Sequence, residues 1–149
     1  MLSILFTVNI VVTAIMVGVI WTIQLVHYPF FHRLEKDNYE LHMDDHREKI
    51  SYIVIPVMLA ELLTAIGLVL INSRYQPEFI AGLILLLLIW ISTALLQVPS
   101  HSRLAGGYNP SEVQKLLKSN WIRTGLWSIR LILLIFVLIR ASSNVSILR

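Results

Sequence analysis

Four long apolar stretches constrain the fold of this chain more than any other feature of its sequence. An α-helix needs about 20 consecutive, mostly apolar residues to cross the hydrocarbon core of a bilayer. Backbone polar groups inside lipid must bond within their own segment, so such stretches form helices. The four stretches cover residues 2–27, 50–71, 79–98 and 121–139. The sequence therefore predicts an all-α membrane protein, a four-helix transmembrane bundle that forms a single domain over residues 1–149.

Composition excludes most classes of soluble protein. Charged residues make up 14% of the chain and hydrophobic residues 56%, whereas a soluble domain carries about 25% charged residues. The chain has no cysteine, which excludes disulfides, a thiolate nucleophile and cysteine metal ligands. It also lacks a phosphate-binding loop, a nucleophile elbow and a dinucleotide fingerprint. The lipid bilayer is the expected partner. The net charge is +3, but the positive residues lie mostly in short connections beside apolar runs, as membrane topology predicts, so no nucleic acid is expected as a partner.

Lysine and arginine are distributed unequally between the two ends of the predicted spans. The first and third connections hold eight of these residues, and the opposite side holds three. Because basic residues are retained in the cytoplasm, this imbalance predicts that both termini lie on the same, non-cytoplasmic side. The eight are Arg33, Lys36, Arg47, Lys49, Arg103, Lys115, Lys118 and Arg123, and the three are Arg74, Arg140 and Arg149.

Two of the helices are predicted to extend beyond their spans. Asn109, Pro110 and Glu112 form a helix start in which Asn109 is the N-cap. The fourth helix is therefore expected to begin in the cytoplasm near Pro110, well before its span. The charged segment 37–49 is compatible with helix and predicts a similar cytoplasmic extension of the second helix.

All five histidines fall at or just beyond the predicted cytoplasmic ends of the spans. His27 ends the first span, His46 precedes the second and His101 follows the third. Four-helix bundles build metal and cofactor sites from inward side chains on facing helices, and histidine is the commonest metal ligand. His27, His46 and His101 are therefore predicted metal ligands. Interfacial or solvated histidines are the alternative, which fits His32 and His42 best.

Glu61 is the sharpest polar signal inside a span. An ionisable residue at this depth costs at least about 2.5 kcal/mol, so it is expected to face the bundle interior and to have a partner. Arg130 and Arg123, both on the fourth helix, are the available cations. Two interpretations remain open: a structural ion pair between the second and fourth helices, or a catalytic proton carrier or metal ligand below the histidines.

Two glutamines lie one turn inside the spans. Gln24 and Gln97 precede His27 and His101 by three and four residues. They are predicted to orient a histidine or a bound cofactor. Hydrogen bonding between helices is the alternative.

The fourth helix has one polar and aromatic face. Asn120, Arg123, Trp127 and Arg130 recur at helical spacing, and the rest of the helix consists of side chains suited to lipid. This face is expected to point inward. Arg123, as a catalytic residue, and Asn120, as a binding residue, are predicted to engage an oxygen or anion of the substrate.

A short repeat relates the two halves of the chain. Residues 29–34 and 99–104 share Pro, Arg and Leu at equivalent positions, at an offset of 70 residues. Each segment follows a span and precedes a polar helix that leads into the next span. Duplication of a helical hairpin and chance are both consistent with so few matched positions.

Four segments carry a resemblance to known proteins. They are Gln24–Phe31, Pro56–Glu61, Gln97–Leu104 and Asn120–Trp127. In these segments the chain resembles a family of small, uncharacterised bacterial four-helix integral membrane proteins and, more remotely, the anthrone-oxygenase-like membrane proteins. The near family implies this fold and a multi-pass protein of the bacterial inner (cytoplasmic) membrane. The remote family implies oxidation of an aromatic or quinone-like substrate.

These features lead to one main hypothesis of function. The protein is expected to be a membrane-embedded oxidoreductase that acts on a lipophilic small molecule near the cytoplasmic face. His27, His46 and His101 would bind iron, copper or zinc, or a haem, because histidine and carboxylate without thiolate suit all of these.

Two other functions remain open. In the first, the protein is a proton-coupled transport or binding protein. Because four helices are few for a carrier, that alternative predicts a homodimer. In the second, the protein is a structural or accessory subunit whose polar residues only hold the bundle together.

Overall fold

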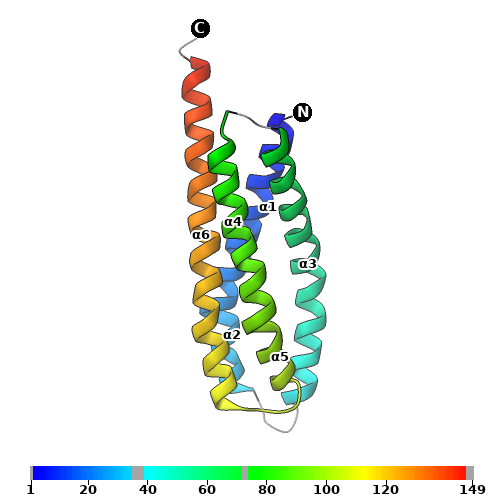
Figure 1. Cartoon of the computed structure of the whole chain (residues 1–149). Helices are drawn as coiled ribbons and strands as arrows, with labels where there is room; N and C mark the ends of the chain where they lie inside the picture. The colour runs from blue at the N-terminus through cyan, green and yellow to red at the C-terminus, as the bar shows by residue number, and fades with distance from the viewer. Residues whose placement is uncertain (1, 35–38, 72–73, 147–149) are drawn as a thin grey trace.

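The computed structural model describes residues 2–34, 39–71 and 74–146, which form four helical segments that run up and down the bundle (Figure 1). The first segment contains α1 (Leu2–Thr22), a π-helical turn (Ile23–His27), α2 (Tyr28–Phe30) and a 3₁₀ turn (Phe31–Arg33). The second is α3 (Tyr39–Ile71). The third contains α4 (Gln76–Ser92), a second π-helical turn (Thr93–Gln97) and α5 (Val98–Leu104). The fourth is α6 (Pro110–Ser146).

Four helices are long and apolar enough to cross a membrane, judged by their length and composition. They cover Ile4–Phe30, Tyr39–Ile71, Gln76–Leu104 and Pro110–Ser143. α1 packs against α3 and α6, and α4 packs against the same two helices. Large apolar side chains on the outside of the bundle are exposed, as a lipid-facing surface requires. The predicted all-α, four-helix transmembrane architecture is confirmed at this level.

α3 and α6 are longer than the apolar stretches that predicted them. α3 begins at Tyr39 and α6 at Pro110, and both helices begin at the same end of the bundle (Figure 1). The Asn109 side-chain oxygen accepts hydrogen bonds from the backbone N–H groups of Ser111 and Glu112, at 3.0 and 3.4 Å. This cap starts α6 where the sequence predicts. The cytoplasmic location of this end, called the α5 end below, remains a prediction.

The two π-helical turns occupy equivalent positions in the two halves of the chain. Each turn is closed by the next residue, which donates its N–H to the carbonyl five residues back. Pro29 and Pro99 follow directly, and a proline in a helix cannot make the usual bond to the carbonyl four residues back. A widened turn is one way in which a helix accommodates this disruption. The turns lie 70 residues apart, so the repeat in the sequence is matched by backbone geometry.

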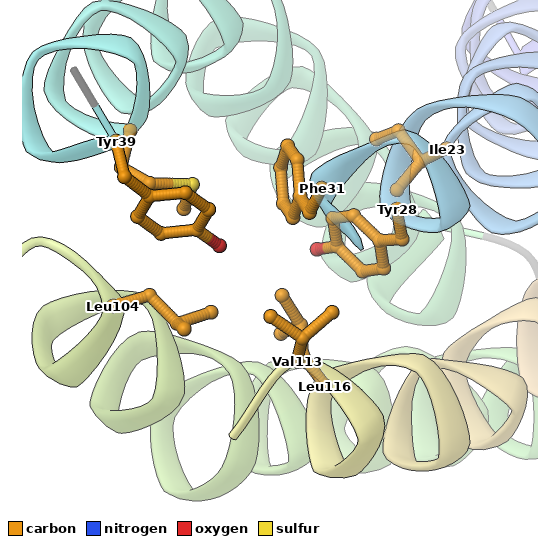
Figure 2. Packing of buried hydrophobic residues seen from close by; sticks show 8 residues of the cluster. Ile23, Tyr28, Phe31, Tyr39, Leu104, Val113 and Leu116 are labelled. Atoms are coloured by element: carbon orange, nitrogen blue, oxygen red, sulfur yellow. The ribbon is translucent and has the colours of Figure 1, made fainter. Parts of the chain in front are cut away.

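Three layers of buried apolar side chains stabilise the bundle. Figure 2 shows the layer at the α5 end, where Tyr28 and Phe31 lie among side chains of α3, α5 and α6. A middle layer surrounds Trp127, and a third layer at the other end includes Leu134. Along α6, buried polar residues alternate with these layers. They form two separate polar regions inside the bundle.

Candidate functional site

The first polar region is centred on an ion pair between α3 and α6. Arg130 Nη1 lies 2.5 Å from Glu61 Oε1, and both side chains are almost fully buried. Glu61 Oε1 also accepts a hydrogen bond from the Thr13 hydroxyl at 2.8 Å. The Trp127 indole N–H donates to Glu61 Oε2 at 3.1 Å. Both oxygens of the carboxylate are therefore occupied by donors from the protein itself.

Each nitrogen of the Arg130 guanidinium also has a hydrogen-bond partner. Its Nη2 donates to Asn9 Oδ1 at 3.1 Å, and its Nε donates to the Gly82 carbonyl at 3.0 Å. Nη1 also contacts the Thr13 hydroxyl. These partners lie on α1 and α4, so the ion pair links all four helical segments. We call Asn9, Thr13, Glu61 and Arg130 the closed network.

The second polar region is centred on Arg123, one layer nearer the α5 end. Arg123 Nε and Nη2 both donate to Asn120 Oδ1, at 3.0 and 2.5 Å. Longer bonds of 3.4 Å join Arg123 to the hydroxyls of Thr93 and Tyr28. The residue is 6% exposed. Within the described ranges no carboxylate forms an ion pair with it, so its charge is held by neutral groups.

The π-helical turns bring polar side chains to this stretch of α6. Gln24, in the first turn, accepts a hydrogen bond from Asn120 Nδ2 at 2.8 Å and donates to the Leu117 carbonyl at 3.3 Å. Gln97, in the second turn, donates to the Ser119 hydroxyl at 3.1 Å. Both glutamines therefore make hydrogen bonds between helices, the alternative that the sequence left open. Through Asn120, Gln24 also positions the Arg123 guanidinium.

The three histidines predicted as metal ligands lie close together. His27 Nε2 and His46 Nδ1 share a hydrogen bond of 2.7 Å. The His46 and His101 rings lie 5.8 Å apart between centroids. His101 Nε2 lies 3.0 Å from the Tyr28 hydroxyl, which in turn accepts a bond from Arg123. The structure thus joins the histidine cluster and Arg123 into one polar region through Tyr28.

The cluster does not form a ready metal site. Among the described residues, no group of three or more His, Asp or Glu side chains is arranged to hold a metal ion. The 2.7 Å between His27 and His46 nitrogens is a hydrogen-bond distance. One atom does favour a ligand: His101 Nδ1 is buried and, in the described part of the chain, has no hydrogen-bond partner. Metal binding would require the His27–His46 bond to break and the rings to turn.

A cavity of about 550 Å³ lies against the histidines and Arg123. His46, His101 and Arg123 give it a polar end, and apolar side chains including Trp90 and Trp127 line its walls. Volumes of about 300–1,000 Å³ with mostly apolar walls and few polar groups are typical of small-molecule sites. Three lining residues on α3 and α5 are roughly half exposed on the outside of the bundle: Ile55, Leu59 and Val98. The cavity therefore reaches the apolar surface.

A smaller cavity of about 370 Å³ also borders the histidine pair. It is lined by His27, His42, Asp45, His46 and Lys49, together with apolar residues. His46 lines both cavities, so the His27–His46 hydrogen bond lies where they adjoin.

Several residues of these regions were not singled out from the sequence. Tyr28 and Thr93 contact Arg123, whereas Asn9 and Thr13 belong to the closed network. Asn9 and Thr13 do carry a signal, because two polar residues four apart lie on one face of an otherwise apolar helix. The signal of Tyr28 is weaker, since tyrosine is common at span ends.

Comparison of the chain with protein-family models, with curated proteins and with solved structures gives no match. The family resemblance drawn from the sequence therefore remains a prediction.

Proposed function

We propose that this protein is a membrane-embedded oxidoreductase that acts on a lipophilic small molecule reaching the larger cavity from the bilayer. One observation carries the proposal: an apolar cavity that reaches the lipid-facing surface ends at a cluster of three histidines and a buried arginine. A lipophilic molecule in this cavity would place its polar end beside His101 and Arg123. The chemistry would take place inside the bundle, shielded from water.

In this proposal His27, His46 and His101, once the His27–His46 hydrogen bond is broken, would hold an iron or copper ion, which would supply the redox chemistry when bound. Two of the three would suffice for the iron of a haem, whereas zinc would serve only as a Lewis acid because it has no redox chemistry. His101 Nδ1, which has no hydrogen-bond partner among the described residues, supports this assignment. Arg123, positioned by Asn120 and Gln24, binds an oxygen of the substrate. Glu61 has a different role, because both its oxygens are occupied. It fixes Trp127, which forms part of the cavity wall.

The first experiment is elemental analysis and absorption spectroscopy of the detergent-purified protein. Wild type is compared with His101→Ala and with His42→Ala, a matched control on the smaller cavity. We expect one metal ion or haem per chain in wild type and in His42→Ala, and its loss in His101→Ala. A protein that stays metal-free after metal is added back contradicts the assignment, as does equal loss in the two variants.

A second function, proton-coupled transport by a homodimer, is favoured by one specific observation. His46 lines both cavities and is hydrogen-bonded to His27, which provides a path for a proton between them. Proton flux into liposomes, lost in His46→Phe and kept in His42→Phe, would favour this function. If neither metal nor flux is found and Glu61→Gln only lowers stability, the structural-subunit alternative is the one that remains.

We further propose that the α5 end faces the cytoplasm of a bacterial inner membrane, as the distribution of lysine and arginine predicts. The chain has no cysteine, so single cysteines report location directly. Gln114→Cys lies on an exposed face of α6 near the α5 end, and Ser142→Cys lies on an exposed face near the other end. In intact cells a membrane-impermeant maleimide should label only Ser142→Cys. The reverse labelling contradicts the orientation.

A further inference from the structure

Among the residues that the structure describes, the charge of Arg123 has no counterion. Burying an arginine away from water costs several kcal/mol unless an anion or a full set of hydrogen bonds compensates. Asn120, Thr93 and Tyr28 supply hydrogen bonds but no negative charge. Arg130, on the same helix, has the Glu61 carboxylate at 2.5 Å. The bundle therefore provides a carboxylate counterion for Arg130 but, among the described residues, none for Arg123.

The cavity beside Arg123 offers no negative charge either, as far as its described lining shows. None of the described residues that line it is an aspartate or glutamate. Its one other arginine, Arg47, forms an ion pair with Asp44 at 3.3 Å on the exposed side of α3. The polar end of the cavity thus carries one uncompensated positive charge. An anion bound there would gain charge-assisted hydrogen bonds in an environment that excludes water.

The rest of the cavity is suited to a hydrocarbon chain. From Arg123 its walls continue through Met16, Ile20, Met58 and Trp90. They end at the partly exposed Ile55, Leu59 and Val98, between α3 and α5. A chain leaving between these helices would continue into the bilayer without exposing apolar surface to water.

From this geometry we infer that the larger cavity binds a single-chain amphiphile with a carboxylate head, the head lying on Arg123 and the chain leaving between α3 and α5. One guanidinium balances one negative charge, whereas a phosphate monoester would bring about −1.5 to −2 charges. The inference rests on the proposed function in one respect, the access of a lipophilic molecule to this cavity. It does not depend on the presence of a metal.

The test uses fluorescence of the full chain in a neutral detergent. Trp90 and Trp127 line the cavity, while Trp21 and Trp121 contact each other elsewhere, 5.7 Å apart between ring centroids. In a Trp21→Phe/Trp121→Phe background, a long-chain carboxylic acid brominated along its chain should quench the two remaining tryptophans saturably. Its methyl ester, brominated at the same positions, should bind about 10-fold more weakly or worse, because it loses the charge-assisted bonds. An alkyl phosphate of equal length, also brominated at these positions, should bind more weakly than the acid because its second negative charge would be buried without a counterion.

Two variants test whether Arg123, rather than the rest of the cavity, recognises the head group. Arg123→Gln should reduce the preference for the acid over the ester to within about 3-fold. Arg47→Gln, the matched control, should leave it unchanged. If Arg123→Gln does not fold, Asn120→Asp supplies an internal carboxylate to Arg123 and should abolish the same preference.

The outcomes that overturn the inference are distinct from those that overturn the proposed function. Equal binding of acid and ester in wild type, or tighter binding of the phosphate, overturns the carboxylate head and leaves a lipophile-binding cavity. Saturable binding of none of the three overturns both the inference and the substrate class of the proposed function. If the protein is metal-free but prefers the acid, the inference is upheld and the proposed oxidoreductase function is overturned.

Discussion

The two buried arginines of α6 lie seven residues apart and have opposite surroundings. Arg130 is bonded to the Glu61 carboxylate and to groups on α1 and α4. Arg123 is bonded to neutral groups only, within the described ranges, and lines a cavity of about 550 Å³. On one face of α6, Arg130 thus belongs to the closed network, whereas Arg123 lines a cavity in which a ligand could contact it.

The two surroundings distinguish a buried charge that helps to hold the fold together from a buried charge that is available to bind a ligand. A buried pair whose hydrogen bonds are all made is costly to break, because removing one partner leaves an uncompensated charge. It has no capacity left for a ligand. A buried charge without a counterion destabilises the protein on its own and gains most when an anion arrives. Glu61 and Arg130 fit the first case and Arg123 fits the second.

Removing the Glu61 charge should have the largest effect on stability. Glu61→Gln leaves Arg130 buried without a counterion, so the free energy of unfolding should fall by about 3–5 kcal/mol. Unfolding in mixed detergent micelles, followed by circular dichroism, measures the change. Replacing both members of the pair, as Glu61→Met/Arg130→Met, should restore part of the loss. A fall below about 1 kcal/mol in the single variant would contradict the assignment of the closed network.

Trp127→Phe should have an intermediate effect. Phenylalanine keeps most of the ring in the middle layer but cannot donate to Glu61 Oε2. One unmet hydrogen bond of a buried carboxylate costs about 1–3 kcal/mol, so the variant should be less destabilised than Glu61→Gln. The same unfolding assay applies. A loss equal to that of Glu61→Gln would mean that packing of the indole, rather than its bond to Glu61, stabilises this layer.

Arg123→Gln should have the smallest effect on stability. The lost hydrogen bonds are offset by relief of an uncompensated buried charge, so the free energy of unfolding should change by less than about 1 kcal/mol. A loss as large as that of Glu61→Gln would show that Arg123 is structural too, and the distinction between the two regions would disappear.

The sequence was sufficient to predict the helices and the depth of the polar residues. Span length determines the number of helices, and Asn109 marks the start of α6. Histidines at the same ends of antiparallel spans share one depth, so the convergence of His27, His46 and His101 could be predicted. Whether they hold a metal is still a prediction.

Rotation of the helices about their axes could not be predicted in the same way. Glu61 has two arginines within reach along α6, and its choice of Arg130 depends on which faces of α3 and α6 meet. The rotation of each helix about its axis is set by the packing of all four helices. Pro29 and Pro99 similarly indicate a disturbed helix but not its form. The widened turns that bring Gln24 and Thr93 to α6 appear only in the structure.

One paired measurement tests the central distinction most directly: the thermal midpoint of Glu61→Gln and of Arg123→Gln, each with and without the long-chain carboxylate. A ligand present at 100 times its dissociation constant stabilises a protein by about 2.7 kcal/mol. We predict that Glu61→Gln melts well below wild type but still shifts upward with the ligand. Arg123→Gln should melt near wild type and show about half of the wild-type shift or less, because a 10-fold weaker affinity leaves a stabilisation of about 1.4 kcal/mol at the same ligand concentration. A ligand-induced shift in Arg123→Gln equal to that of wild type, or its loss in a folded Glu61→Gln, would contradict this account.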